Sequence, residues 1–370
     1  MPSIRIEAID TLFFRDGRPF SMGEETFATG IFPPPPSVLY GALRSAYASE
    51  NGIFDSSSIE NETKDLNIKS LYFKSDGDFL FPCPFDIVEA KVKKQTVEEN
   101  RQERNREIRE KTYLVEQLKI EKRPNISNLL SDLEFFYKAD KHIESIKNGL
   151  FDDTQLYDYL NNSMGNEIKI RKWSDFLKIE TKIGIGRENT TKQSQDGNLY
   201  RIDMKRILNN VSLNCNFDFD NPDKNSNIKK EGLLKLGGEG KIAKYVTPRN
   251  RDVFDFDSSK IIFSGNCFKL YLATPAFFAN GYFPDIGKTL GIKAKLLALC
   301  TDRAINIGGF DMVKKEPKTM LKAIPAGSIF CFETDEEGIN IIKQSQGISI
   351  SEISNEYIKQ GYGIAYFGNF

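Results

Sequence analysis

Four consecutive prolines at positions 33–36 constrain this chain more strongly than any other feature of its sequence. Each proline fixes φ near about −65° and removes a backbone donor, so the four form a stiff, polyproline-like lead-in. Because proline is tolerated in a first helical turn and serine is a good cap, we expect a helix to start at Pro36 or Ser37. An apolar stripe follows at i, i+4 and i+7, formed by Leu39, Leu43 and Ala46.

A neighbouring face of the expected helix carries Tyr40, Arg44 and Tyr47. A flat ring beside a guanidinium group is suited to stack a nucleic-acid base or to hold a phosphate. The same pattern is also typical of a core helix with ordinary surface residues. The sequence of the helix leaves both interpretations open.

The charge balance limits how this chain can bind nucleic acid. The 370 residues suffice for about two domains, each with its own core. Its 51 Lys and Arg residues nearly cancel 52 Asp and Glu residues, which leaves a net charge of −1. Coating of nucleic acid by bulk charge is therefore excluded, and any binding must use a segregated basic patch.

The cysteines and the apolar runs predict a cytoplasmic protein. Five cysteines are scattered without a CxxC pair, which argues against a zinc or disulfide framework and suits a reducing compartment. The first residues show the pattern of a strand, not of a signal peptide. The longest apolar run, at about 270–279, is too short to span a bilayer and contains Pro275.

Few residues in this sequence are suited to catalysis or metal binding. The single histidine, His142, stands in a charged segment typical of a solvated surface. Acidic pairs occur in polar loops without a Cys or His partner, so we predict no metal site and no cofactor. Neither Ser37 nor Ser328 has the setting of a nucleophilic serine.

Strands and helices alternate along the chain in a pattern that predicts an α+β fold with antiparallel sheets. The Asp76-Gly77 pair between apolar runs indicates a hairpin within residues 71–81. We expect further strands over 4–10, 180–187, 199–205, 261–278 and 328–333, and a short helix within 337–360.

The domain organisation follows from two breaks in this pattern. A polar, turn-rich stretch at 216–227 is the expected boundary between a first domain, 1–225, and a second, 226–370. A run of mixed charge over 98–111 is typical of a solvated helix. We therefore expect a charged helical insertion at about 90–175 in the first domain.

The glycine-rich segment 237–241 does not fit a nucleotide-binding loop. Gly232 and Gly237 have the P-loop separation, but Gly238 and Glu239 stand where lysine and serine or threonine are required. A dinucleotide fingerprint also matches in part, yet Pro248 and strand-like sequence follow where a helix is needed.

Glycines with cationic or aromatic neighbours recur in three places, near 184–192, 237–244 and 361–363. Glycine lets a backbone approach a ligand closely and exposes N–H groups to phosphate oxygens, although tight turns at strand ends need glycine too. Together with the pairs Arg15/Arg18 and Tyr40/Arg44, these three places predict a surface that follows a phosphate backbone. The candidate RNA-binding residues are Arg15, Arg18, Ser37, Tyr40, Arg44, Gly186, Arg187, Lys192, Tyr200, Gly237, Gly238, Lys241, Gly361, Tyr362 and Gly363.

Five sequence blocks in this order resemble one family, the third subunits of the Cmr complexes, which are type III-B CRISPR effectors of the RAMP superfamily. The blocks span most of the chain except about 90–175 and 338–360. They are residues 13–19, 32–44, 180–187 with the trailing 197–200, 236–240 and 324–328.

The resemblance implies two ferredoxin-like (RRM-like) domains and no catalytic residues. It further implies a subunit that caps the 5′-tag end of the CRISPR RNA (crRNA), docks on the large polymerase-like subunit, lies beside the backbone-forming RAMP subunits and meets target RNA only indirectly. A short strand of fixed sequence is well held by stacking on aromatic rings and by N–H groups and cations at its phosphates.

Two other functions stay open at this point. One is a repeat-processing endoribonuclease of the same superfamily, for which His142 is the available histidine. The other is an unrelated nucleotide-dependent enzyme that uses residues 237–241.

Overall fold

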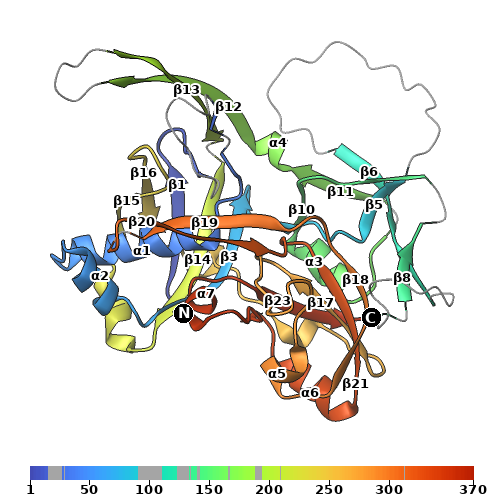
Figure 1. Ribbon diagram of the computed structural model, residues 1–370. Coiled ribbons are helices and arrows are strands. Elements are labelled where there is room, and N and C mark those ends of the chain that lie inside the picture. The colour runs from blue at the N-terminus through green and yellow to red at the C-terminus, as the bar shows by residue number, and fades with distance from the viewer. Residues whose placement is uncertain are drawn as a thin grey trace.

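The computed structural model describes residues 1–15, 27–28, 30–90, 111–122, 133, 135–139, 142–165, 167–187, 194–208, 210–311 and 313–370. Within these ranges helices cover antiparallel sheets, which confirms the α+β fold class (Figure 1). Arg18, Lys192 and positions 98–110 of the charged run lie outside the described residues.

The first part of the chain builds one large sheet, the N-terminal sheet. Ile4 and Ile6 of its first strand face the core, while Arg5 and Glu7 pair with each other on the other face. The expected hairpin is confirmed, with Asp76 at φ 52° in its turn. In spatial order the strands are β15 (Glu231–Lys235), β16 (Ile242–Val246), β1 (Ser3–Ala8), β14 (Val211–Phe219), β3 (Leu66–Ser75), β4 (Asp78–Pro82), β10 (Gly149–Asp152), β11 (Glu167–Lys172), β6 (Lys111–Gln117), β5 (Ile87–Ala90) and β9 (Ile143–Ser145).

The proline run leads into α1 (Pro36–Glu50), as the sequence predicts. Pro36 occupies the first turn, and the stripe of Leu39, Leu43 and Ala46 is buried against the sheet. No side chain caps the helix, so Ser37 does not act as its cap. Two short helices lie near α1: α2 (Ser56–Glu62) and, from the other end of the chain, α7 (Asn355–Lys359).

A second, five-stranded sheet, the C-terminal sheet, packs on the first. Tyr271, Ile364 and Tyr366 join the core of the N-terminal sheet from one of its faces. The other face of the C-terminal sheet is covered by α5 (Ile286–Leu290) and α6 (Glu336–Gln344). The strand order is β18 (Ala294–Cys300), β21 (Ile329–Thr334), β17 (Cys267–Leu272), β23 (Ile364–Asn369) and β22 (Ile348–Ser349).

Hairpins extend from this body (Figure 1). The green hairpin of β12 (Leu177–Arg187) and β13 (Ser194–Ile207) projects away from it, with β2 (Phe27–Ala28) parallel to β13. The orange hairpin of β19 (Ile305–Asp311) and β20 (Glu316–Ala323) instead crosses over α1. A third, small hairpin joins β7 (Lys119–Lys122) and β8 (Phe135–Lys138).

The prediction of a helical insertion at 90–175 is wrong for the residues that the structure describes. That segment contributes β6 to β11, and its helices are α3 (Asp153–Leu160) and the single turn α4 (Trp173–Phe176). Ile168 and Ile170 alternate with charged residues in β11, and this strand pairs with β6, which lies far from it in the sequence. The local charge pattern, on which the helix prediction rested, carries no information about such long-range pairing.

The N-terminal sheet continues past the expected domain boundary at 225/226. A short 3-10 helix at Pro222–Asn227 occupies it, but β15 and β16 beyond it pair with each other and with β1. These two strands therefore continue the N-terminal sheet, and the division into two domains stays a prediction.

A buried polar network joins the two sheets. The Asp86 carboxylate accepts hydrogen bonds from the Tyr159 hydroxyl at 2.8 Å and from Gln117 at 3.1 Å. The Lys269 ammonium, from β17, donates to the Tyr159 carbonyl at 2.8 Å and to Asn162. Burial raises the pKa of Asp86 and lowers the pKa of Lys269 to about 8.

Candidate nucleic-acid interface

A groove of about 660 Å³ lies between segments from the first 60 residues and segments from 235–362, and we call it the α1 groove. Residues of α1, of α2 and of the β19–β20 hairpin line it. The hairpin crosses over α1 in Figure 1. The loops at 14–15 and 237–238 and the segment 356–362 complete the lining. Seven of the predicted residues line it: Arg15, Ser37, Tyr40, Arg44, Gly237, Gly238 and Tyr362.

Helix α1 presents Ser37, Tyr40 and Arg44 to the groove. The Arg44 Nε atom donates to the Thr63 hydroxyl at 2.6 Å, and the guanidinium lies 5.6 Å from the centre of the Tyr40 ring. The Tyr40 hydroxyl donates to the Thr63 carbonyl at 3.3 Å. Because this ring is only 7% exposed, the expectation that Tyr40 stacks on a base is corrected: the tyrosine supports Arg44 instead.

The turn at 361–363 is also internal. Tyr362 has no exposed surface, packs 4.9 Å from the Phe277 ring, and places its hydroxyl 3.0 Å from that of Ser37. Gly361 and Gly363 both have positive φ, and a Cβ on either would lie 2.7 Å from neighbouring atoms. The prediction of an exposed RNA-binding turn is therefore wrong: the turn fixes the floor of the groove.

The glycine loop after β15 holds the N-terminal segment in place. Gly237 has φ +80°, and a Cβ there would lie 2.4 Å from the Phe13 carbonyl oxygen. The N–H of Gly238 donates to the same oxygen at 2.8 Å. This N–H is thus occupied within the protein rather than offered to a phosphate. Strand β16 follows the loop, so no helix N-terminus for a dinucleotide is formed.

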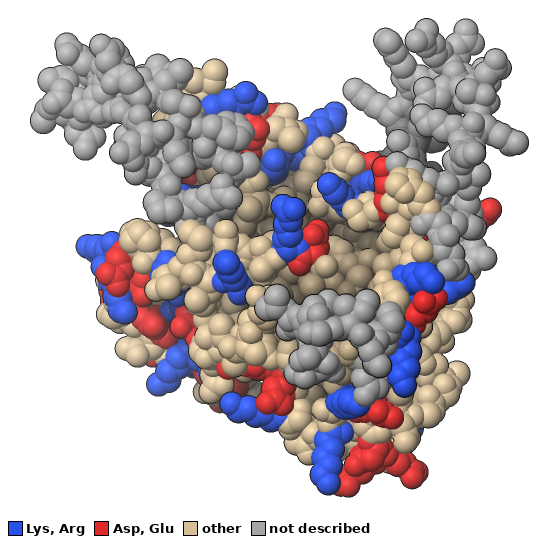
Figure 2. Space-filling model, turned by 45° about the vertical axis from the view of Figure 1, so that its right-hand side comes forward, with Lys and Arg blue, Asp and Glu red and all other residues tan. Residues whose placement is uncertain are grey.

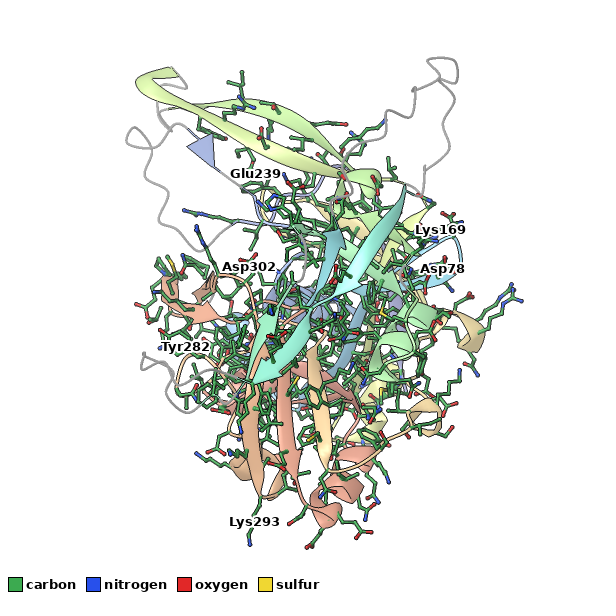
Figure 3. All side chains as sticks on the ribbon, turned by 90° about the vertical axis from the view of Figure 1, so that its right-hand side faces the viewer. Asp78, Lys169, Glu239, Tyr282, Lys293 and Asp302 are labelled. Carbon is green, nitrogen blue, oxygen red and sulfur yellow. The ribbon has the colours of Figure 1, made fainter. Side chains whose placement is uncertain are left out.

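Lys241 lies outside the groove and is paired. Its ammonium bonds Asp10 at 2.7 Å, which lowers the pKa of that carboxyl to about 2. Glu239, which lies under the β12–β13 hairpin in Figure 3, pairs with Lys182 of that hairpin at 3.1 Å. These ion pairs tie the loop to its neighbours.

The residues predicted on the β12–β13 hairpin do not line the groove. Gly186 and Arg187 end β12, where the pairing shifts register between Ile185 and Arg187. The half-buried ring of Tyr200 lies over Gly184, where a Cβ would come within 2.2 Å of the ring. The structure therefore does not bring these residues together with the seven that line the α1 groove.

Two parts of the groove were not predicted. One is Lys235, at the end of β15, and the other is the β19–β20 hairpin with Phe310 and Lys318. The signal for the hairpin was present in the sequence, because Gly308, Gly309 and Phe310 precede a lysine-rich run.

Cations in the groove differ in their availability. Lys318 pairs with Glu356 at 3.0 Å, whereas Arg44 and Lys235 make no ion pair with any described residue. On the face shown in Figure 2, basic and acidic side chains are interspersed and form no single basic patch.

Within the described ranges, no cluster of three His, Cys, Asp or Glu side chains is arranged to hold a metal ion. Nor does any helix in those ranges have the length and apolar character needed to cross a membrane.

These features define a class: an α+β protein of antiparallel sheets in which segments far apart in the sequence line one groove, and in which Arg44 and Lys235 of that lining form no ion pair with a described residue. Residues 4–370 match the model of the CRISPR-associated protein (Cas_Cmr3) family. The chain belongs to this family and is a subunit of a type III CRISPR effector of the Cmr kind.

Solved structures show the same fold. One is a chain of the type III-B Cmr-beta complex bound to cognate target RNA, with 18% identity and a TM-score of 0.52 over 98% of this chain and 96% of that chain. A chain of the same kind of complex, bound to cognate target RNA and AMPPnP, gives 17% identity and a TM-score of 0.50 over 97% and 94%. No curated protein sequence matches the chain.

Proposed function

We propose that this chain is a non-catalytic RNA-binding subunit that holds the 5′-tag end of the crRNA in the α1 groove. The observation that carries the proposal is the convergence in that groove of Arg15, Arg44 and Lys235, from segments far apart in the sequence. A groove of about 660 Å³ accommodates part of a strand, and a short strand needs only a few phosphate contacts. Local binding of this kind is compatible with a net charge of −1.

The electrostatics of the groove support a phosphate as the group bound. The Arg44 side chain is held by Thr63 through Nε alone, which leaves its terminal nitrogens available for a bidentate contact. The Lys235 ammonium, at the end of β15, adds a second cation that forms no ion pair with a described residue. Together they can neutralise one or two phosphates.

We further propose that the subunit has two ferredoxin-like domains, docks on the large polymerase-like subunit beside the backbone-forming RAMP subunits, and meets target RNA only indirectly. Exposed Ile179 and Ile183, on one face of β12, support contacts with other subunits. Isoleucines exposed on the same strand face are the kind of surface that a subunit contact buries.

The proposal assigns no chemical step to the groove. Among the described residues that line it, none is a histidine or a cysteine, and exposed His142 is not part of the lining. The Glu356 carboxylate pairs with Lys318, and the Asp311 carboxylate accepts two backbone N–H groups of its own turn. These carboxylates are therefore engaged in structure rather than poised as bases.

A test exchanges the charge of each unpaired cation. In complexes assembled with crRNA, Arg44→Glu and Lys235→Glu should each lower the retention of crRNA by about 10-fold or more, because a favourable charged contact becomes repulsive. Retention is measured as crRNA per protein after washing at increasing salt. Lys293→Glu is the matched control, since this exposed lysine lies at the opposite end of the molecule from the β12–β13 hairpin (Figure 3).

Circular dichroism must show that the variants fold as the wild type does. Retention equal to that of the Lys293→Glu control in both variants would disprove RNA binding in the α1 groove. The recovered RNA should also be intact. Metal-independent shortening of repeat RNA by the wild type, lost in His142→Ala, would favour the endoribonuclease instead.

A further inference from the structure

The β19–β20 hairpin places an aromatic ring in the α1 groove with much of its surface open. Phe310 lines the groove and is 54% exposed. The other aromatic side chains of the lining are less available, since Phe14, Tyr40 and Tyr362 are buried and Tyr357 is half-buried. An aromatic ring that is open within a groove offers a flat face on which a nucleic-acid base can stack.

The end of the hairpin far from its turn is anchored in a small core, whereas Phe310, nearer the turn, is exposed. Ile307 packs with Phe277 and Tyr362 in a small core, with Leu321 against it. The pairing then shifts register between Ile307 and Gly309. A Cβ on Gly309 would meet only the Lys318 side chain at 3.7 Å, so the backbone there is open to a ligand.

The turn of the same hairpin carries two lysines. Exposed Lys314 and Lys315 follow Phe310 in the turn and make no ion pair with a described residue. Asp311, which stands between them and the ring, directs its carboxylate to the N–H groups of Val313 and Lys314 at 3.0 Å. An aromatic face with flanking lysines is the arrangement by which proteins stack a base of a single strand while holding its phosphates.

We propose that Phe310 is a base-stacking platform for single-stranded RNA, with Lys314 and Lys315 at the adjacent phosphates. This inference rests on the proposed function of the α1 groove and adds the hairpin as a second RNA contact across the groove from Arg44. It takes over the stacking role that the sequence suggested for Tyr40.

The experiment uses the full-length chain and single-stranded RNA of the host's repeat tag, with 2-aminopurine placed at one position at a time. At one position the fluorescence should be quenched by the wild type and by Phe310→Trp, but not by Phe310→Ala. Anisotropy should show an affinity about 5- to 100-fold weaker for Phe310→Ala. Phe54→Ala removes a ring that is 84% exposed and outside the groove lining, and should change neither signal.

An abasic nucleotide provides a second measurement. Loss of the stacked base should weaken binding to the wild type about as much as Phe310→Ala does, with no further loss when both are combined. Equal affinity and equal quenching for wild type and Phe310→Ala would overturn the inference, while loss of RNA by Arg44→Glu would leave the proposed function standing. Absence of RNA binding by the wild type would overturn both. Loss of another subunit by Phe310→Ala, with RNA affinity unchanged, would also overturn the inference by assigning the ring to protein docking.

Discussion

At the scale of single residues, Lys269 shows how the interior of this protein tolerates a charge. Its ammonium is desolvated, yet it donates to Tyr159 and Asn162 and lies 4.2 Å from the centre of the Tyr159 ring. Asp86 nearby supplies a compensating carboxylate, which favours the protonated amine. Desolvation outweighs these contacts, and the pKa of Lys269 therefore falls to about 8.

This pKa gives stability a measurable dependence on pH. Between pH about 8 and 10.5 the unfolded chain holds the Lys269 proton and the folded chain does not, so the free energy of unfolding rises with pH through that window. Lys269→Met should lack this rise, and the difference from wild type should grow by up to about 3 kcal/mol in urea titrations from pH 7.5 to 10.5. The buried thiol of Cys215, whose pKa is raised by burial alone, contributes equally to both proteins and cancels in the difference.

Lys293→Met serves as the reference for this measurement, because Lys293 is exposed and the substitution removes only a solvent-exposed amine. Its curve should run parallel to that of the wild type. A Lys269→Met curve that is also parallel would show that Lys269 keeps its proton as readily in the folded chain as in the unfolded one.

The glycines show what residue types alone can and cannot reveal. Sequence correctly marked positions where the chain needs special backbone geometry, such as Gly237 and Gly361. It did not show what approaches them, because Phe13 and Ile68 are brought there by tertiary packing. Glycine next to a cation is therefore a sound signal for close approach, but the approaching group here is the protein itself.

At the scale of elements, α1 contains a glycine at a position where the packing of the helix leaves room for a larger side chain. Gly41 lies in mid-helix, where glycine is unfavourable, and a Cβ there would have nothing within 4 Å. The residue lines the α1 groove, so the space beside it opens toward the proposed RNA.

Substitutions at Gly41 should separate stability from binding. Gly41→Ala should raise the free energy of unfolding by about 0.5–1 kcal/mol, because alanine is the better helix former. Gly41→Phe should fold but lower crRNA retention by about 10-fold or more, because the ring occupies the groove. Ser49→Phe, at an exposed position of α1 outside the lining, controls for the added ring. Full retention by Gly41→Phe would place the RNA elsewhere.

Local sequence predicted the elements whose signals are local. The start of α1, the β3–β4 hairpin and the paired strands β12 and β13 were all predicted correctly. The strands from β6 to β11 were not, because their partners lie far away in sequence and local charge favoured a helix. The groove was predicted in part: Arg15 and Arg44 were named, but nothing local shows that β19 and β20 cross over α1.

At the scale of the whole molecule, one core connects both sheets. Tyr271 and Tyr366 of the C-terminal sheet belong to the same buried cluster as Phe81 of β4. The Tyr271 hydroxyl also donates to the Pro82 carbonyl at 2.6 Å. Separation of the two sheets would expose these rings to water, so we expect neither sheet to be stable on its own.

Unfolding should therefore be a single transition. Trp173, the one tryptophan, packs 4.4 Å from the Phe73 ring and reports on the N-terminal sheet. Its fluorescence and the far-UV circular dichroism should change at the same urea concentration. Tyr271→Phe should shift both midpoints together by an amount equivalent to about 1 kcal/mol. A second step in the dichroism after the fluorescence change is complete would show independent sheets.

The hydroxyl contact between Ser37 and Tyr362 joins residues 325 positions apart. During translation, α1 leaves the ribosome long before the segment that completes the floor of its groove has been synthesised. A nascent chain consequently carries an unfinished groove. On the proposed function, the guide RNA can be bound only after synthesis has passed Tyr362, so this subunit would join the ribonucleoprotein late in its assembly.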